Sequence, residues 1–285
     1  MDVLIFSKDR GFQLFTLLET LQSKILGIDN IIVQFSYSNN KFLEGYLILN
    51  EYFKDVTFVD ETQFGFYNTL NAVVESEIQS DNLFLEVDDV VYYDTIDLNE
   101  LNNTFNKFPK ASKLSVSLNS SIFNSSYYNK VDNSIIVDRN QFIDNNIQSL
   151  VLKYPFNASG AIHRKKDLIN LLRSEVINNP IDLEIKGSSS PIFNSYSLTL
   201  YNDKEVNKQM HTNNTLKRYE ELYTTEYLNS LLLNKEVLSV DNLNFDKMED
   251  DMRWFNGEDI GRFPIFPWEI SPIYHETIIN NRKTI

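Results

Sequence analysis

The stretch VLIFSKDRGFQLFTLLETLQSKI, residues 3–25, decides the fold of this chain. It opens with four apolar residues, passes through the polar segment Ser7–Arg10, and then repeats large apolar side chains at near-helical spacing as far as Ile25. A short apolar run is typical of a buried strand, and the spaced run is typical of an amphipathic helix. The stretch therefore predicts a strand, a polar loop and a helix, with Gly27 ending the helix.

The same alternation continues outward for three more strands. The predicted strands are residues 31–35, 56–59 and 83–87, and the predicted helices between them are residues 42–53 and 66–78. Strands that alternate with helices of this length need crossover connections, which join parallel strands. We therefore predict an α/β fold with a mostly parallel central sheet flanked by helices.

The rhythm changes in the rest of the chain. The predicted elements there are helix 97–108, strand 114–118, loop 119–134, strand 134–137, a turn into a strand at 154–164, helix 166–176, a helical turn at 181–186, strand 196–201 and helix 225–234. From residue 241 onward aromatic residues and prolines dominate, which favours an irregular closing segment. We expect a single domain over residues 1–285, with one half at 1–118 and a second, more irregular half at 119–285.

The composition limits the classes of partner. The net charge is −14, which disfavours tracking a nucleic-acid backbone or docking on anionic lipid. The chain has no cysteine, so disulfides and thiolate metal sites are excluded. No apolar run reaches the length of a transmembrane span and the first residues lack a signal-peptide pattern, so we expect a cytoplasmic protein. An acidic protein of this kind needs a local basic cluster or a metal ion to hold an anionic ligand.

Polar residues follow each of the first four predicted strands. Ser7–Arg10 follows the first strand, Tyr37 lies beyond the second, Asp60 ends the third, and Asp88 and Asp89 end the fourth. Ligands of parallel sheets bind outside the carboxyl ends of the strands. The sequence therefore predicts a binding site at this edge.

The strongest signal at the edge is the cluster of carboxylates after residue 83. An apolar strand delivers Glu86, Asp88 and Asp89 within four residues. Clustered carboxylates repel one another and tend to be kept where a cation offsets them, and Mg²⁺ and Mn²⁺ prefer such oxygen ligands. The alternative is a solvated strand end followed by a turn, where Asp is also common.

The segment after the first strand favours an anion. Arg10 offers a fork of donors suited to phosphate, Lys8 offers a point charge, and Ser7 precedes a helix N-terminus. The alternative is an ordinary helix start with solvated charges. Asp60 could accept hydrogen bonds from a base or ribose, or it could be a turn residue. Tyr37 could stack on a base, or it could be a half-buried surface tyrosine.

These features resemble glycosyltransferases of the Rossmann-like GT-A fold. The resemblance rests on the strand followed by Ser-Lys-Asp-Arg and a helix, and on the strand that ends in Asp88–Asp89 before Val-Val-Tyr; it covers residues 2–110 and continues more weakly to about residue 240. The chain is most similar to bacterial and viral members that open with Phe-Ser-Lys-Asp-Arg. The resemblance implies that Asp88 and Asp89 hold Mn²⁺ or Mg²⁺ against the diphosphate of a nucleotide sugar. Glu86 departs from the Asp that opens the family's acidic motif, which leaves its contact with the metal open.

The resemblance also implies roles in the second half of the chain. An inverting enzyme needs a carboxylate near the acceptor hydroxyl, and Glu184, after an Asn-Pro turn, is the candidate base with Asp182 as the alternative. Both residues are also typical of a helix N-terminus. Gly160 would line the donor sugar or mark a strand bulge. His211 would be a late metal ligand or an ordinary surface histidine.

We therefore expect a metal-dependent glycosyltransferase of glycan synthesis. It would move a sugar from a UDP-, GDP- or dTDP-sugar to an acceptor hydroxyl with inversion, binding the donor in the first half and the acceptor in the second. A nucleotidyltransferase is disfavoured by the single glycine after Ser-Lys-Asp-Arg, and a phosphohydrolase by an acidic motif on the fourth strand instead of an early one. A catalytically inactive descendant that binds sugars or a protein remains a third alternative.

Overall fold

The computed structural model describes residues 1–117, 128–131, 133–139, 154–204, 206–209, 224–238 and 270–272. His211 and most of the closing segment expected after residue 241 lie outside these ranges. Within them, every helix is too short or too polar to cross a bilayer.

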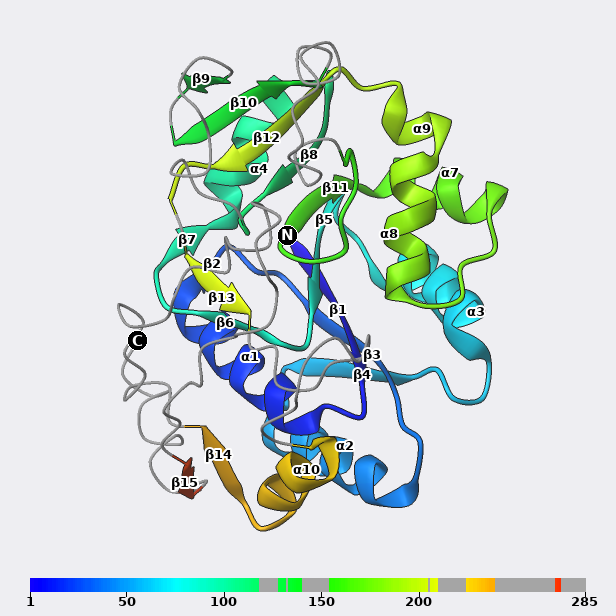
Figure 1. Cartoon of the computed structure of the whole chain (residues 1–285), viewed down its shortest axis with the longest axis vertical. Helices are drawn as coiled ribbons and strands as arrows, with labels where there is room; N and C mark the ends of the chain where they lie inside the picture. The colour runs from blue at the N-terminus through cyan, green and yellow to red at the C-terminus, as the bar shows by residue number, and fades with distance from the viewer. Residues whose placement is uncertain are drawn as a thin grey trace, which may run out of the picture.

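A nine-stranded sheet forms the centre of the molecule (Figure 1). Its strands are β1 (Asp2–Lys8), β3 (Ile31–Ser36), β4 (Val56–Asp60), β5 (Asn82–Val87), β8 (Ala111–Ser115), β9 (Tyr128–Val131), β10 (Ser134–Asp138), β11 (Ala161–Arg164) and β12 (Leu198–Asn202). They are ordered β4-β3-β1-β5-β11-β8-β12-β10-β9. The four strands from β4 to β5 are parallel, as predicted. The other half is mixed, because β11 and β10 run against their neighbours.

Six short strands form three separate pairs beside the main sheet. The pairs are β2 (Ile25–Leu26) with β7 (Ile96–Asp97), β6 (Val90–Tyr92) with β13 (Asn207–Gln209), and β14 (Glu236–Leu238) with β15 (Ile270–Pro272). The β6–β13 pair matters for the site, because β6 follows the turn at Asp88–Asp89 directly.

Helices cover both faces of the sheet, so the molecule has three layers (Figure 1). One face carries α1 (Gly11–Lys24), α2 (Asn40–Tyr52), α4 (Leu98–Lys107) and α10 (Thr225–Leu233). The other carries α3 (Gly65–Ala72), the π-helix η1 (Val73–Glu77), α7 (Lys165–Ser174), α8 (Pro180–Ser189) and α9 (Pro191–Asn194). The prediction of an α/β fold with flanking helices is confirmed.

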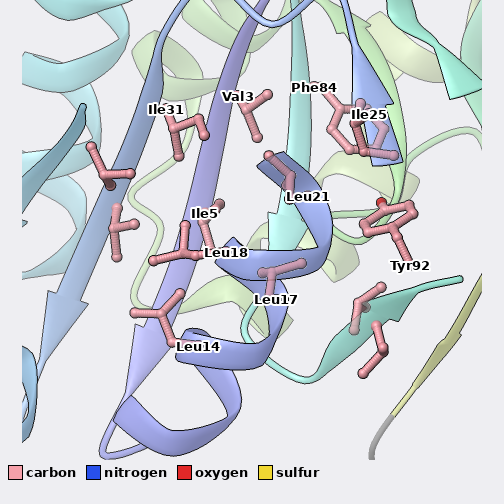
Figure 2. Packing of buried hydrophobic residues seen from close by; sticks show 14 of the residues in the cluster. Val3, Ile5, Leu14, Leu17, Leu18, Leu21, Ile25, Ile31, Phe84 and Tyr92 are labelled. Atoms are coloured by element: carbon pink, nitrogen blue, oxygen red, sulfur yellow. The ribbon is translucent and has the colours of Figure 1, made fainter. Parts of the chain in front are cut away.

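Two apolar clusters hold these layers together, one on each face. Along β1, Val3 and Ile5 belong to the cluster under α1, whereas Leu4 and Phe6 belong to the cluster under α3 and α8. The alternation follows from the two-residue period of a strand. Figure 2 shows the leucine side chains of α1 pointing toward β1 and its neighbours. Each fully buried Leu or Ile contributes about 1.5–3 kcal/mol, so these layers are stabilised mainly by apolar burial.

Several boundaries differ from the sequence prediction. The strand expected at residues 114–118 is β8, which spans Ala111–Ser115, and its buried Ser112 and Lys113 donate to the Leu198 carbonyl and to Asn157 Oδ1. The helix expected at 66–78 is α3 followed by the π-helical turn η1. The loop expected at 119–134 contains β9. The helical turn expected at 181–186 is the ten-residue helix α8, with Asn179 as its N-cap.

Candidate functional site

The carboxyl edge of the sheet collects the strand ends that the sequence singled out. β1, β3, β4 and β5 are parallel, so their carboxyl ends lie at one edge. The antiparallel strand β11 enters the sheet there, since Ala161 pairs with Leu85 near the end of β5. The loop after β1 is tied to the loop after β3, because Asp9 adopts a φ of 59° and its Oδ1 accepts from the Ser38 amide at 2.6 Å.

Arg10 joins the two aspartates at the end of β5. Its Nη1 lies 3.0 Å from Asp88 Oδ1 and 3.2 Å from Asp89 Oδ2. The Lys8 amide donates to Asp88 Oδ2 at 3.3 Å, so Asp88 is also held by the backbone of the preceding strand. The structure thus brings together three of the residues that the sequence proposed for phosphate and metal binding.

The electrostatics of this cluster are those of a largely buried ion pair. Burial raises the pKa of Asp88 to about 6, although the Arg10 guanidinium pulls it down. Burial lowers the pKa of Arg10, but the two carboxylates more than offset this and leave it above its usual value. The buried Tyr46 hydroxyl lies beneath the loop, where it bonds Ser7 Oγ at 2.7 Å and accepts from the Arg10 amide at 3.2 Å.

The two aspartates have the donor set that a divalent cation accepts. Asp88 Oδ1 and Asp89 Oδ2 converge on a single nitrogen of Arg10, which stands where a small cation would be attracted. Mg²⁺ is commonly bound through one or two carboxylates plus substrate phosphates. No cluster of three or more His, Asp or Glu side chains suited to a metal occurs in the described ranges. The residues therefore fit a metal that is completed by a phosphate ligand, provided Arg10 shares or leaves the carboxylates.

Glu86 lies in the interior, where both of its carboxylate oxygens are engaged. Oε1 accepts from the Val87 amide at 2.9 Å, Ser159 Oγ at 3.0 Å and the Gly160 amide at 3.1 Å, and Oε2 accepts from the Tyr92 hydroxyl. Burial raises its pKa to about 7, although these hydrogen bonds oppose the shift. Its contacts are those of a residue that ties β5 to β6 and to the segment before β11.

The two candidate bases on α8 have different surroundings. Glu184 is directed toward the segment before β11, since its Oε1 accepts from the Ala158 amide at 2.8 Å. Burial raises its pKa, and the Ala158 amide and the charge of Lys113 partly offset the rise. Asp182 instead closes the start of the helix, where it accepts from Asn178 and forms an ion pair with Lys186 at 3.0 Å. Of the two, only Glu184 is thus engaged with the segment before β11.

The remaining expected residues lie at or near the same edge. Ser7 is buried against Tyr46 and the Lys8 side chain is exposed. Tyr37 is half-buried, and Asp60 is the exposed last residue of β4, whose Oδ1 accepts from the Thr62 amide at 2.8 Å.

Gly160 allows a close approach of two chain segments. It has a φ of 59°, and a Cβ there would meet Ser117 Oγ at 2.1 Å. The Val116 amide donates to its carbonyl at 2.8 Å. A glycine is therefore needed here, because any side chain would prevent this segment from packing against the residues just beyond β8.

Sequence reasoning missed Lys113 and Asn157. Lys113 is buried in the middle of β8, and its Nζ donates to Asn157 Oδ1 at 2.7 Å. The available signal was a lysine between the apolar positions Ala111 and Leu114, which is unusual in an interior strand. Because residue 113 fell outside the strand boundary expected from the sequence, its burial was not foreseen.

A hollow elsewhere on the described part of the molecule is less suited to the expected chemistry. It has a volume of about 560 Å³, and its lining includes Asp81, Asn82 and Lys165. These residues lie at the amino-terminal end of β5, opposite to the aspartates. Parallel sheets bind their ligands at the carboxyl edge, so this hollow is not part of the candidate site.

The fold and this edge define the class of protein: an α/β protein with paired aspartates and a basic loop at the carboxyl edge of its sheet. Sequence comparison then gives a relative. The chain is 26% identical over 215 residues to the bifunctional glycosyltransferase pgtA of Dictyostelium discoideum, an alignment that covers 65% of this chain and 28% of pgtA. No protein-family model matches the chain. The chain is therefore similar in sequence to part of a glycosyltransferase, and it spans about a quarter of the length of that curated relative.

Solved structures with partial overlap include two nucleotide-sugar complexes. The mannosyltransferase PcManGT from Pyrobaculum calidifontis in complex with GDP-Man and Mn²⁺ is 16% identical, with a TM-score of 0.38 and coverage of 60% of this chain and 46% of PcManGT. S. aureus TarS 1-349 in complex with UDP-GlcNAc is 9% identical, with a TM-score of 0.46 and coverage of 75% and 62%. The overlaps are partial, so the chemistry of this chain is inferred from its own residues.

Proposed function

We propose that this chain transfers a sugar from a nucleotide sugar to an acceptor hydroxyl, with a divalent metal and with inversion. The observation that carries the proposal is the convergence of Asp88 Oδ1 and Asp89 Oδ2 on one point, within 3.0 and 3.2 Å of Arg10 Nη1. Two carboxylate oxygens so arranged at the carboxyl edge of parallel strands suit a cation that is shared with a diphosphate. The similarity to pgtA supports sugar transfer as the reaction class.

The donor would lie along the carboxyl ends of β1, β3, β4 and β5. Asp88 and Asp89 would hold Mn²⁺ or Mg²⁺, which supplies neutralisation of the negative charge that develops on the leaving diphosphate. Arg10 would turn its guanidinium from the aspartates toward a phosphate, where its fork of donors binds two oxygens. Lys8 adds positive charge from an exposed side chain. Asp60 and Tyr37 are proposed to contact the ribose and base.

Glu184 is proposed as the base that receives the acceptor proton. Its Oε1 already accepts from the Ala158 amide, which leaves Oε2 as the oxygen for the acceptor hydroxyl. A new bond forms between the acceptor oxygen and the anomeric carbon, and the bond from that carbon to the diphosphate breaks. The nucleoside diphosphate leaves with the electron pair and the proton stays on Glu184. A raised pKa suits this role, because a base near the working pH transfers protons most effectively.

A thermal-shift screen tests the proposal. UDP, GDP, dTDP and CDP are each added with and without Mn²⁺ to the wild type, to Asp88→Ala/Asp89→Ala and to a control, Asp81→Ala, at the opposite end of β5. Binding to the native state stabilises by about 2.7 kcal/mol at a ligand concentration of 100 Kd. We expect one nucleotide to raise Tm only with Mn²⁺, in the wild type and the control but not in the double variant. No shift with any nucleotide in a folded wild type would overturn the proposal.

A second candidate is a sugar-binding protein without catalysis, and the Arg10 ion pairs favour it. Arg10 already neutralises both aspartates without any other ligand. If that arrangement persists in solution, nucleotide binding would be independent of Mn²⁺. The same screen separates the two candidates, because only the enzyme requires the metal.

A further inference from the structure

The middle of β8 holds a lysine that the proposed reaction does not use. Lys113 is 1% exposed, and burial lowers its pKa to about 7. In the described ranges no carboxylate forms a direct ion pair with it. Its Nζ donates to Asn157 Oδ1 at 2.7 Å and lies 5.6 Å from the centre of the Tyr201 ring. A buried lysine with one neutral partner destabilises the fold, so its presence calls for another explanation.

Asn157 gathers several contacts of the segment before β11. Its Oδ1 accepts from Lys113, its carbonyl bonds His163 Nε2 at 2.8 Å, and its Nδ2 donates to the Ser159 carbonyl. His163 is fully buried and stacks on Phe156 with ring centres 4.2 Å apart. Burial lowers the pKa of His163 to about 3, which keeps the imidazole neutral. Three hydrogen bonds, to Lys113, Ser159 and His163, therefore restrain the conformation of Asn157.

The three residues after Asn157 connect the proposed base to the strand of the aspartates. The Ala158 amide donates to Glu184 on α8, whereas Ser159 Oγ and the Gly160 amide both donate to Glu86 on β5. Four consecutive residues, 157–160, thus bridge α8 and the end of β5. A shift of this bridge would move Glu184 relative to Asp88 and Asp89.

We propose that Lys113 is a positioning residue for Glu184, acting through Asn157 and the bridge of residues 157–160. The inference rests on the proposed function, because it takes Glu184 as the base. Lys113 anchors one end of the bridge by donating to Asn157 Oδ1, and its positive charge lowers the pKa of Glu184. Misplacement of a reacting group by about 1 Å can cost on the order of a hundredfold in rate. Lys113 therefore fixes where the base stands and how readily it holds a proton.

The charges around Glu184 determine the sign of the pH effect. Lys113 from β8 lowers the pKa of Glu184, and Arg139, beyond β10, adds positive charge on the side of Lys113. His163 from β11 is neutral. The base must be ionised to accept a proton, so removal of the Lys113 charge raises the pKa of Glu184. The acid limb of the kcat profile then moves to higher pH.

The kinetic test compares Lys113→Met, Lys113→Gln and the control Lys110→Met, whose lysine is exposed just before β8. The substrate is the nucleotide sugar of whichever nucleotide the screen identifies, and its hydrolysis is followed by release of nucleoside diphosphate. We expect Lys113→Met to lower kcat by about tenfold or more, with KM for the donor within about twofold of the wild type. Both Lys113 variants move the acid limb upward, because both lack the charge. Lys113→Gln keeps more of kcat, because its amide can still donate to Asn157.

A second measurement does not depend on activity. Thermal unfolding of Lys113→Met, Glu184→Gln and the double variant gives a double-mutant cycle, in which residues that interact are not additive. We expect the Tm shift of the double variant to differ from the sum of the single shifts. Lys113→Met is expected to fold and to melt no lower than the wild type at pH 7, because methionine suits a buried site.

Three outcomes overturn the inference. An additive cycle shows that Lys113 and Glu184 do not interact. An unchanged kcat and pH profile in Lys113→Met shows that the interaction has no catalytic effect. A parallel loss of donor binding and Tm shows a purely structural lysine. A wild type that binds no nucleotide overturns the proposed function instead, and the cycle then reports whether the bridge exists as a structural feature alone.

Discussion

The two sides of the candidate site neutralise their charges in different ways. On the side of β1 and β5, Arg10 contacts Asp88 and Asp89 directly at 3.0 and 3.2 Å. On the side of β8 and α8, Lys113 and Glu184 meet through Asn157 and the Ala158 amide, with no direct ion pair between them in the described chain. On the first side the opposite charges are in direct contact, and on the second side a neutral segment separates them.

The difference shows how one protein can prepare charged groups for different tasks. A direct ion pair favours the charged form of both partners, so Arg10 opposes the burial that raises the pKa of Asp88 to about 6. An uncompensated burial favours the neutral form, and the pKa values of Lys113 and Glu184 are displaced in that sense. Under the proposed function, the first side would bind a cation and a phosphate, and the second would move a proton. Glu86 and residues 157–160 join the two sides.

The largest expected effect on stability comes from removing the hydrogen bonds of Glu86, which join the two sides. Glu86→Ala leaves the Val87, Gly160 and Tyr92 donors without their acceptor, and an unsatisfied buried donor costs about 1–3 kcal/mol. We expect a loss of about 3 kcal/mol or more in the free energy of unfolding, measured by urea denaturation. Glu86→Gln keeps one acceptor oxygen and should lose less, and Glu51→Ala, at an exposed site on α2, serves as the control. A loss below about 0.5 kcal/mol in Glu86→Ala would mean that the hydrogen bonds of Glu86 are dispensable for stability.

A smaller effect is expected from the close approach at Gly160. Gly160→Ala combines a left-handed φ of 59° with a Cβ that meets Ser117 Oγ at 2.1 Å. Gly65→Ala is a matched control, because Gly65 has a φ of 77° and open space around it. The left-handed conformation costs an alanine about 1–2 kcal/mol, which both variants should lose. Only Gly160→Ala should lose about 1 kcal/mol more, from overpacking. Equal losses in chemical denaturation would show that Ser117 moves aside freely.

The direct ion pair can be broken by Arg10→Gln. Without the guanidinium, Asp88 and Asp89 repel each other and a divalent cation has no competitor. We expect Mn²⁺ to bind about tenfold more tightly in the absence of nucleotide, a difference of about 1.4 kcal/mol. The nucleoside diphosphate should bind more weakly in the presence of Mn²⁺, because a phosphate partner is lost. Titration calorimetry measures both, with Lys41→Gln as an exposed control. Weaker binding of both ligands would contradict a competition between Arg10 and the metal.

The smallest effect at neutral pH is expected from His163→Phe. The variant keeps an aromatic ring beside Phe156 but loses the bond to the Asn157 carbonyl, at a cost of about 1 kcal/mol. The pKa of His163 is about 3 in the folded chain and ordinarily about 6.5. The wild type therefore loses stability as pH falls from 6.5 toward 3, because the unfolded chain binds the extra proton. The difference in Tm between variant and wild type should shrink or reverse between pH 7 and pH 4. A constant difference would place the imidazole in contact with solvent.

The two sides also differ in how far they could be foreseen. The edge at Ser7–Arg10 and Asp88–Asp89 was predictable, because alternating strands and helices bring consecutive strand ends together. The ion pair between Arg10 and the aspartates was not foreseen, since it joins residues 78 and 79 positions apart. Glu86 was predicted at the metal site because it lies two residues before Asp88. In the structure, the alternation of the strand directs its side chain toward Tyr92 and Ser159.

The sequence by itself determined the layers of this protein and the strand ends that carry charge. Apolar periodicity is local, and it distinguishes strand from helix without knowledge of distant residues. Only the tertiary structure decided that Lys113 is buried, that it donates to Asn157, and that Glu184 accepts from the neighbouring Ala158 amide. These contacts come from segments 26 to 44 residues apart, and the sign of each pKa shift depends on burial that no single segment contains. The physical reason is that a charge takes its properties from the groups that surround it, and the fold assembles those groups.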